Sequence, residues 1–167
     1  MTGARAILPL ARLIGDDLET LCRDLDEELG RIAGKRLLIT GGGGFLGYYL
    51  VQAALHWNRT RSSRGPIDIT VYDNYLRGVP RWLEALAGEP KLSLVKFDMT
   101  HPLPIDIGHF DFIVHAAGIA SPIYYRQKPL ECIDANIVGT TNILEACRYN
   151  QVEHLVYASS SSVYGTN

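Results

Sequence analysis

The stretch LLITGGGGFLGYYL, residues 37–50, decides the fold. Its apolar start is typical of a buried strand, and the apolar residues from Phe45 onward favour a helix. Gly41, Gly44 and Gly47 fall at the junction, where a backbone without side chains can approach a ligand closely and a helix N-terminus attracts anions. We therefore expect a strand, a tight turn and a helix that together hold a pyrophosphate group.

The rest of the chain repeats this order of strand and helix. Strand patterns occur at 35–40, 67–73, 92–98, 111–118 and 154–159, and helix patterns at 45–57, from Pro80 onward and after Pro129. Strands joined by helical crossovers lie parallel in one sheet with helices on both faces. We predict a Rossmann-type α/β fold with a doubly wound parallel sheet. The basic segment RTRSSRGP (59–66) is interpreted as a solvated loop.

An acidic residue, Asp73, ends the second predicted strand. Its position after a glycine-rich turn matches the dinucleotide fingerprint, in which a carboxylate accepts hydrogen bonds from the adenosine ribose. The same carboxylate repels a 2′-phosphate, so NAD is preferred over NADP as the cofactor, although Arg77 keeps NADP binding open. The alternative is a purely structural glycine turn without a ligand.

The N-terminal residues carry a separate amphipathic pattern. Apolar residues recur every three or four positions at Leu18, Leu21, Cys22, Leu25, Leu29 and Ile32. We expect an amphipathic helix that begins at Asp16, with Glu19 as its capping-box partner, and ends near Gly34. The predicted domains are therefore an N-terminal helical extension, 1–34, and an NAD-binding domain, 35–167.

Composition narrows the partners and the compartment. The chain has 167 residues, 47% hydrophobic side chains and a formal net charge of -2, which fits one domain without a basic field for nucleic acid or membrane. Its three cysteines, Cys22, Cys132 and Cys147, show neither CxxC nor His/Cys spacing, so we expect reduced thiols, no metal site and a cytoplasmic protein. Residues 37–58 carry no charge, but the glycines near their start argue against a transmembrane helix.

Six short motifs occur in order along the chain. They are TGGGGFLG (40–47), DN (73–74), DM (98–99), HAAG (115–118), PLECIDANIVGTTNILEAC (129–147) and ASSSSVYG (158–165). Together they resemble the extended short-chain dehydrogenase/reductases, specifically the NAD-dependent sugar-nucleotide epimerase/dehydratase group. The resemblance extends over nearly everything from Lys35 to Asn167.

The resemblance implies a set of NAD contacts. The pyrophosphate would lie against Gly41, Gly44, Phe45, Leu46 and Gly47, the adenosine against Asp73, Asn74, Asp98 and Met99, and the nicotinamide-side ribose against Ala116, Ala117 and Gly118. It also implies a nucleoside-diphosphate sugar as the substrate and a homodimer for the full-length protein.

The serines of ASSSSVYG end the last predicted strand. Ser160 lies four residues before Tyr164, where this group keeps a catalytic Ser or Thr that hydrogen-bonds the reacting sugar hydroxyl. Ser159 is interpreted instead as a backbone cap, an alternative that also applies to Ser161. The predicted substrate-binding residues are Ser121, Tyr125, Ser161 and Ser162.

The group's proton-transfer pair, Tyr-x-x-x-Lys, is expected on a helix after the serines. Tyr124 and Lys128 form such a string, but they precede the serines and run into Pro129, so we interpret them as a chance match. We therefore expect the 167 residues to be the nucleotide-binding part of an enzyme, without its C-terminal substrate portion and inactive alone.

The residues around the serines separate the candidate reactions. Ser-Ser-Val-Tyr-Gly is most similar to the epimerases, so an NDP-sugar epimerase that works through a keto-sugar intermediate is the leading prediction. UDP-glucuronate decarboxylation is the alternative: the ASP-x-x-Tyr segment at 120–125 favours it, and Ser162, where decarboxylases usually carry glutamate, counts against it. Dehydratases of this group keep an Asp-Glu pair that Ser161 and Ser162 do not supply. A non-catalytic NAD-binding scaffold, with the helix at 16–33 as its partner surface, is the third alternative.

Overall fold

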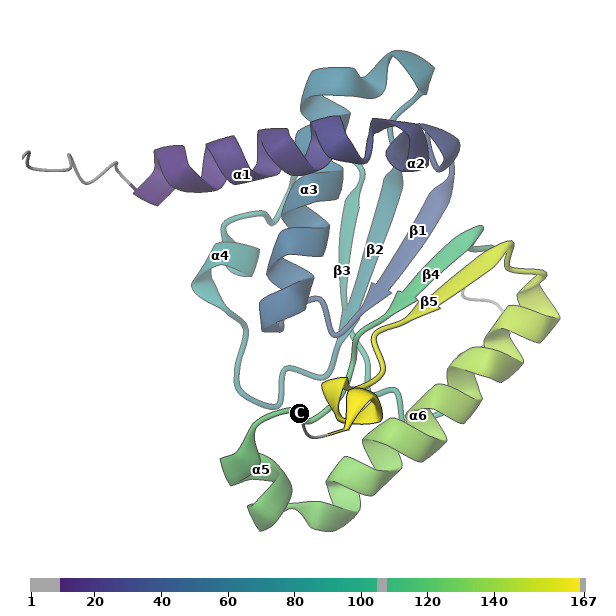
Figure 1. Cartoon of the computed structure of the whole chain (residues 1–167). Coiled ribbons are helices and arrows are strands. Elements are labelled where there is room, and N and C mark those ends of the chain that lie inside the picture. The colour runs from purple at the N-terminus through teal and green to yellow at the C-terminus, as the bar shows by residue number, and fades with distance from the viewer. Residues whose placement is uncertain (1–9, 105–107, 166–167) are drawn as a thin grey trace, which may run out of the picture.

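The computed structural model of the protein describes residues 10–104 and 108–165. Five parallel strands form one sheet with helices on both faces (Figure 1). The strands are β1 (Arg36–Thr40), β2 (Asp68–Asp73), β3 (Leu92–Lys96), β4 (Phe112–His115) and β5 (His154–Tyr157). The α-helices are α1 (Leu10–Asp24), α2 (Asp26–Arg31), α3 (Phe45–Arg61), α4 (Arg81–Glu84), α5 (Pro122–Gln127) and α6 (Pro129–Asn150), and the 3-10 helices are η1 (Ser62–Arg64) and η2 (Ser161–Tyr164). The predicted α/β fold with a parallel sheet is confirmed.

The strand order places a crevice beside β1. The order across the sheet is β3-β2-β1-β4-β5, and every pairing is parallel, with Ile39 of β1 opposite Val71 of β2 and Val114 of β4. The chain moves outward from β1 through β2 to β3 and then crosses to β4 on the other side. In such sheets a ligand binds at the carboxyl ends of the strands where the direction changes. That point lies between β1 and β4.

The side chains of β1 alternate between two cores, one on each face of the sheet. Leu37 and Ile39 pack in a cluster with the inner side of α3, including Val51 and Trp57. Leu38 packs in the opposite cluster, which contains Met99, Phe110, Ile113 and Ile143, the last of these from α6. Because both faces are covered, β1 is apolar without interruption from Leu37 to Ile39, as its continuous run predicts.

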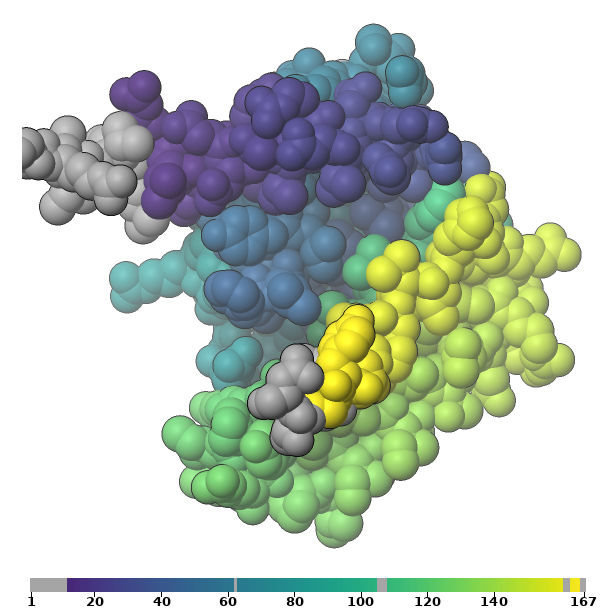
Figure 2. Space-filling view, in the orientation of Figure 1, coloured from purple at the N-terminus to yellow at the C-terminus, as the bar shows by residue number. Residues whose placement is uncertain are grey.

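The first described residues form the helices α1 and α2, and α1 lies across α3 (Figures 1 and 2). The expected helix start at Asp16 is wrong, because α1 already begins at Leu10 and carries Asp16 in its interior. The helix also breaks at Leu25, whose side chain is 42% exposed, whereas Leu18 and Cys22 are buried. The residues from Leu10 to Leu13 are good helix formers, so the helix extends before the expected capping residue.

The segment interpreted as a solvated loop, 59–66, is largely helical. Helix α3 continues to Arg61 and is followed by η1. Arg61 donates hydrogen bonds to the carboxylate of Glu19, and His56 Nε2 lies 3.0 Å from the same carboxylate. These contacts from Arg61 and His56 lower the pKa of Glu19 to about 2. The end of α3 is thus tied to α1 across 42 residues of sequence.

One further helix, α5, forms within the segment ASPIYYRQKP. Ser121 stands before it in an extended conformation, and Pro122 occupies its first turn, where the missing N–H of proline has no intrahelical partner to lose. Within the described ranges, 10–104 and 108–165, the helices are all too short or too polar to cross a membrane.

Candidate functional site

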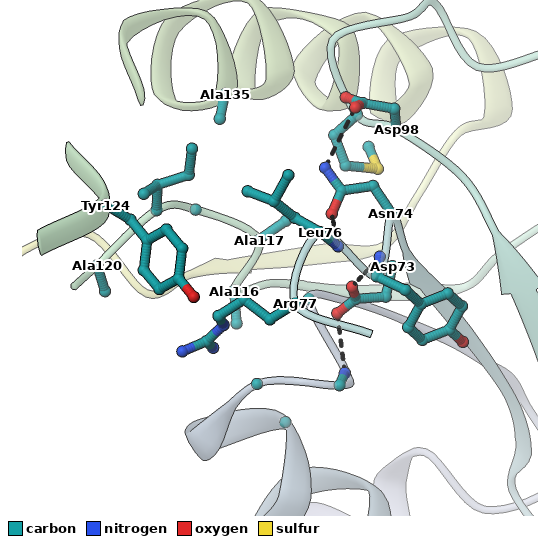
Figure 3. A pocket seen from close by; sticks show the side chains of 18 of the residues that line it. Asp73, Asn74, Leu76, Arg77, Asp98, Ala116, Ala117, Ala120, Tyr124 and Ala135 are labelled. Carbon is teal, nitrogen blue, oxygen red and sulfur yellow. Dashed lines mark hydrogen bonds between the residues drawn. The ribbon is translucent and has the colours of Figure 1, made fainter. Parts of the chain in front are cut away.

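A cleft of about 850 Å³ opens at the carboxyl edge of the sheet, beside the change of strand direction. Its walls are the glycine turn after β1, the loops after β2, β3 and β4, and the adjoining ends of α5 and α6. Figure 3 shows side chains from these separate loops facing the same space. The cleft brings together residues from 41 to 135 along the chain.

The glycine turn packs directly on the loop after β4. Gly41 has a φ of +71°, and a Cβ added to it would lie 2.6 Å from both the carbonyl oxygen of Ala116 and the amide nitrogen of Ala117. A side chain at Gly47 would likewise overlap the backbone of Gly42. Phe45, the first residue of α3, is 80% exposed and lines the cleft. The turn therefore presents backbone and the start of a helix to a ligand, which suits an anionic group.

Asp73 is held against this turn at the end of β2. Its Oδ2 accepts a hydrogen bond from the Gly43 amide at 2.9 Å, and its Oδ1 accepts one from the Tyr75 amide at 2.7 Å. Each carboxylate oxygen has a second acceptor position, and the residue lines the cleft. The carboxylate is thereby oriented before any ligand arrives.

A second acidic residue, Asp98, also lines the cleft. The Asn74 amide donates to its Oδ2 at 3.2 Å, and the backbone and hydroxyl of Thr100 donate to its Oδ1 at 3.0 and 2.8 Å. Partial burial acts to raise the pKa of Asp98, but the hydrogen bonds from Thr100 and Asn74 outweigh it, so the pKa lies below its ordinary value. Asp98 is therefore ionised at neutral pH and fixes Asn74 beside it (Figure 3).

Two buried polar residues, Thr40 and His115, lie next to the loop after β4. Thr40 Oγ1 accepts a hydrogen bond from the Ala117 amide at 3.3 Å and lies 2.6 Å from His115 Nδ1. Burial lowers the pKa of His115. The sequence reasoning did not assign a role to Thr40 or His115, although polar residues ending two otherwise apolar strands are a usable signal.

All twelve predicted cofactor-binding residues line this one cleft. They are Gly41, Gly44, Phe45, Leu46, Gly47, Asp73, Asn74, Asp98, Met99, Ala116, Ala117 and Gly118. Their convergence is a geometric fact, and the contact that each makes with a cofactor stays a prediction.

The predicted substrate residues are placed less uniformly. Ser121 lines the cleft, as do Tyr124 and Lys128, the two ends of the Tyr-x-x-x-Lys string. Tyr125 is 40% exposed and does not line it. Consecutive residues of a helix point in different directions, so Tyr124 lines the cleft and Tyr125 does not.

The serine cluster lies at the end of β5. Ser160 is exposed just before η2, is not among the residues that line the cleft, and accepts a hydrogen bond at its carbonyl from the Val163 amide at 3.3 Å. Ser159 before it has a φ of +51°. The side chains of Ser161 and Ser162 lie outside the described part of the structure. Their predicted roles, and the catalytic role of Ser160, stay predictions.

Metal binding has no visible basis in the described residues. Across 10–104 and 108–165, no group of three His, Cys, Asp or Glu side chains is arranged to hold an ion. The three cysteines are free thiols, with Cys22 buried and Cys132 and Cys147 half-buried.

The sequence pattern of the NAD dependent epimerase/dehydratase family matches residues 37–167. The chain belongs to this family. The matched region begins at β1 and includes every residue of the cleft, while α1 and α2 lie before it. The family expected from the six motifs is confirmed.

Curated members of the epimerase/dehydratase family resemble this chain over most of its length. It is 35% identical over 130 residues to UDP-glucuronic acid decarboxylase 3 of Arabidopsis thaliana, and the match includes 78% of this chain and 35% of the relative. It is 34% identical over 131 residues to UDP-glucuronic acid decarboxylase 1 of Danio rerio, a match that includes 78% of this chain and 28% of the relative. The chain thus spans about a third of the length of these relatives.

Solved structures of the epimerase/dehydratase family share the fold. A UDP-galactose 4-epimerase aligns with a TM-score of 0.63 and 28% identity over 78% of this chain and 40% of its own. A dTDP-glucose 4,6-dehydratase from Streptomyces venezuelae, solved with NAD bound, aligns with a TM-score of 0.68 and 26% identity over 79% of this chain and 41% of its own.

Proposed function

We propose that this epimerase/dehydratase binds NAD and a nucleoside-diphosphate sugar and takes part in oxidising a sugar hydroxyl. The observation that carries the proposal is the packing of Gly41 against Ala116 and Ala117, with Asp73 hydrogen-bonded to the same turn. A Cβ at Gly41 would fill this junction, so the turn is built for close backbone approach.

The glycine turn and the loop after β2 fit the adenosine end of NAD. The N-terminus of α3 would receive the pyrophosphate, because its backbone dipole favours an anion. Asp73 would accept hydrogen bonds from the adenosine ribose, and the ionised Asp98 with Asn74 would lie at the adenine. Ala117 and Gly118 would face the second ribose. Bound in this way, NAD supplies hydride acceptance and hydride return.

The chain's own residues must then position the sugar and handle a proton. We propose that the Ser160 hydroxyl hydrogen-bonds the sugar hydroxyl that is oxidised. A serine is too weak a base to hold that proton at neutral pH, so a separate base is required. We propose a Tyr-x-x-x-Lys pair outside these 167 residues for that step, with Tyr124 of the cleft as the alternative that an experiment must exclude.

Two reactions remain candidates, each supported by a specific observation. Epimerisation is supported by the Ser-Ser-Val-Tyr-Gly string and by the fold shared with a UDP-galactose 4-epimerase. Decarboxylation of UDP-glucuronate is supported by the curated relatives, which are decarboxylases at 34 to 35% identity. Both begin by oxidation of a ring hydroxyl, so the residues described above serve either reaction.

The assay that tests the proposal follows binding and chemistry separately. Titration with NADH, read by its fluorescence, tests the cofactor site. Incubation with NAD and either UDP-glucose or UDP-glucuronate, with products separated by chromatography, distinguishes epimerisation from decarboxylation. In active protein, Ser160→Ala should lower turnover by roughly 100-fold while NADH affinity stays within about twofold. Absence of NADH binding would refute the proposal. NADH binding without turnover, in protein that carries the Tyr-x-x-x-Lys pair, would favour a non-catalytic NAD-binding role.

We also propose that the protein is a cytoplasmic homodimer in which residues 1–34 extend the domain 35–167. Apolar side chains at helical spacing are exposed along α6, which runs along one edge of the molecule in Figure 2. They are Leu130, Ile133, Ile137 and Leu144. A stripe of this kind is suited to packing on a second copy. Light scattering should give twice the monomer mass, and Ile137→Asp should reduce it to the monomer value.

A further inference from the structure

Arg77 and Tyr124 face each other across the cleft (Figure 3). The guanidinium carbon of Arg77 lies 6.0 Å from the centroid of the Tyr124 ring. Arg77 belongs to the loop after β2, whereas Tyr124 belongs to α5, 47 residues later, and both line the cleft. The two walls of the cleft therefore meet at this pair.

The charges of the cleft single out Arg77. Four carboxylates line the space, namely those of Asp73, Asp98, Glu131 and Asp134. Among the residues that the structure describes, two Lys or Arg side chains line it, Arg77 and Lys128. Lys128 Nζ lies 3.8 Å from a Glu131 oxygen. Among the described residues, Arg77 has no carboxylate within ion-pair distance, and its recorded partner is the Tyr124 ring. Of the two cations that line the cleft, Arg77 is therefore the one whose charge is not balanced by a nearby carboxylate.

The ligands of the proposed function are strongly anionic. NAD and a nucleoside-diphosphate sugar each carry a diphosphate, so both would bring negative charge into a cleft that already holds four carboxylates. The start of α3 offers only partial positive charge. A guanidinium is the side chain best shaped to bind a diphosphate, because its planar donors engage two oxygens at once.

The loop that carries Arg77 has room to adjust. The residue is exposed, and the next residue, Gly78, has a φ of +83° and no atom within 4 Å of where its Cβ would be. The guanidinium makes a cation–π contact with the ring of Tyr124 and no hydrogen bond within the described part of the chain. The pair can therefore exchange this contact for a phosphate without repacking the core.

We propose that Arg77 is a diphosphate-binding residue of this cleft and that Tyr124 positions it. The inference rests on the proposed function, since it names the group that would neutralise a ligand of that site. It gives the Tyr124 ring a role that does not involve proton transfer. It also assigns Arg77 to a diphosphate and not to the 2′-phosphate of NADP.

The test uses binding of two probes, NADH and UDP, to the whole protein. Arg77→Gln should weaken binding of at least one of them by about tenfold or more, the usual effect of losing a charge-assisted hydrogen bond, and Arg77→Lys should recover part of the loss. Tyr124→Leu should weaken the same probe by about two- to fivefold, and Tyr124→Phe, which keeps the ring, should not. Arg81→Gln is the matched control, because Arg81 is exposed on α4 and does not line the cleft.

Each outcome has a distinct meaning. Loss confined to NADH supports the diphosphate of the cofactor as the target, and loss confined to UDP supports that of the substrate. Unchanged affinity for both probes in Arg77→Gln would overturn the inference while leaving the proposed function intact. Selective loss of NADPH binding would also overturn it, because Arg77 would then act on a 2′-phosphate. Failure of the unaltered protein to bind either probe would overturn the proposed function, and the inference with it.

Discussion

The hydroxyl of Thr40 and Nδ1 of His115 lie 2.6 Å apart at the buried carboxyl ends of β1 and β4. Thr40 Oγ1 also accepts a hydrogen bond from the Ala117 amide, so it lies between this loop and His115. Burial lowers the pKa of His115, so the ring is neutral at pH 7, and its Nε2 lies 3.5 Å from the hydroxyl of Thr140 on α6. A neutral histidine therefore links the loop beneath the cleft to α6.

The stability of the protein should depend on pH through His115. Burial lowers the pKa of this histidine below the 6.5 of an exposed imidazole, so the unfolded chain takes up its proton first as the pH falls. The stabilisation is present in full above pH 6.5 and is lost progressively as the pH decreases from there through the folded-state pKa. Urea unfolding at pH 7.5, 6.0 and 5.0 measures this loss.

A pair of variants assigns the effect to His115. His115→Gln should flatten the pH dependence between pH 7.5 and 5.0, because glutamine does not titrate. His101→Gln, at an exposed histidine, should retain it. Identical pH profiles for His115→Gln and the unaltered protein would contradict the neutral histidine derived above.

Asp73→Asn should change the choice of cofactor. The asparagine keeps one oxygen for the Gly43 or Tyr75 amide but removes the negative charge that repels a 2′-phosphate. We expect NADH to bind about tenfold more weakly and the NADH/NADPH affinity ratio to move toward one. Fluorescence titration with both reduced cofactors gives the ratio. Asp68→Asn, at the opposite end of β2, should leave it unchanged, and an unaltered ratio in Asp73→Asn would remove Asp73 from cofactor selection.

The alternation of strands and helices and the glycine turn could be predicted because their signals are local. Within residues 37–50, the apolar run from Leu37 and the glycines after Thr40 specify a strand, a turn and the start of a helix. The interaction of Arg61 with Glu19 could not be predicted in this way, since it joins residues 42 positions apart and depends on how α1 crosses α3. The segment 59–66 therefore read as a loop when only its composition was considered.

Within the cleft, too, the positions of some residues could be predicted from the sequence and those of others could not. Asp73 follows a strand at a fixed offset from the glycines, so its position was predictable. Which of Tyr124 and Tyr125 lines the cleft depends on the rotation of the short helix α5 about its own axis. Two adjacent tyrosines give no sequence signal for that rotation. Arg77 and Tyr124 meet only in the folded chain.

Glu19 should stabilise the attachment of α1 in a pH-dependent manner. Hydrogen bonds from Arg61 and His56 lower the pKa of Glu19 to about 2 from the 4.5 of an exposed glutamate, so its contribution is complete above pH 4.5 and is lost as the pH falls through about 2. Glu19→Gln should lower the melting temperature at pH 7 and weaken the dependence of stability on pH in this acidic range. Glu28→Gln, at an exposed residue of α2, should do neither, and matching behaviour of the two variants would refute the role of Glu19.

Gly41→Ala should damage folding and cofactor binding together. The alanine would have to adopt a φ of +71°, and its Cβ would lie 2.6 Å from the backbone of Ala116 and Ala117, so the turn and the loop after β4 must separate. We expect a loss of about 2 kcal/mol or more in the free energy of unfolding, within the range for forced backbone strain, and a clear decrease in NADH affinity. Urea unfolding and NADH titration measure the two effects. The matched control is Gly15→Ala, because Gly15 lies inside α1 with no atom within 4 Å of its Cβ position, so alanine there should stabilise the protein by about 0.5–1 kcal/mol. If Gly41→Ala were as stable as the unaltered protein and bound NADH equally well, close approach at Gly41 would not be what forms the cleft.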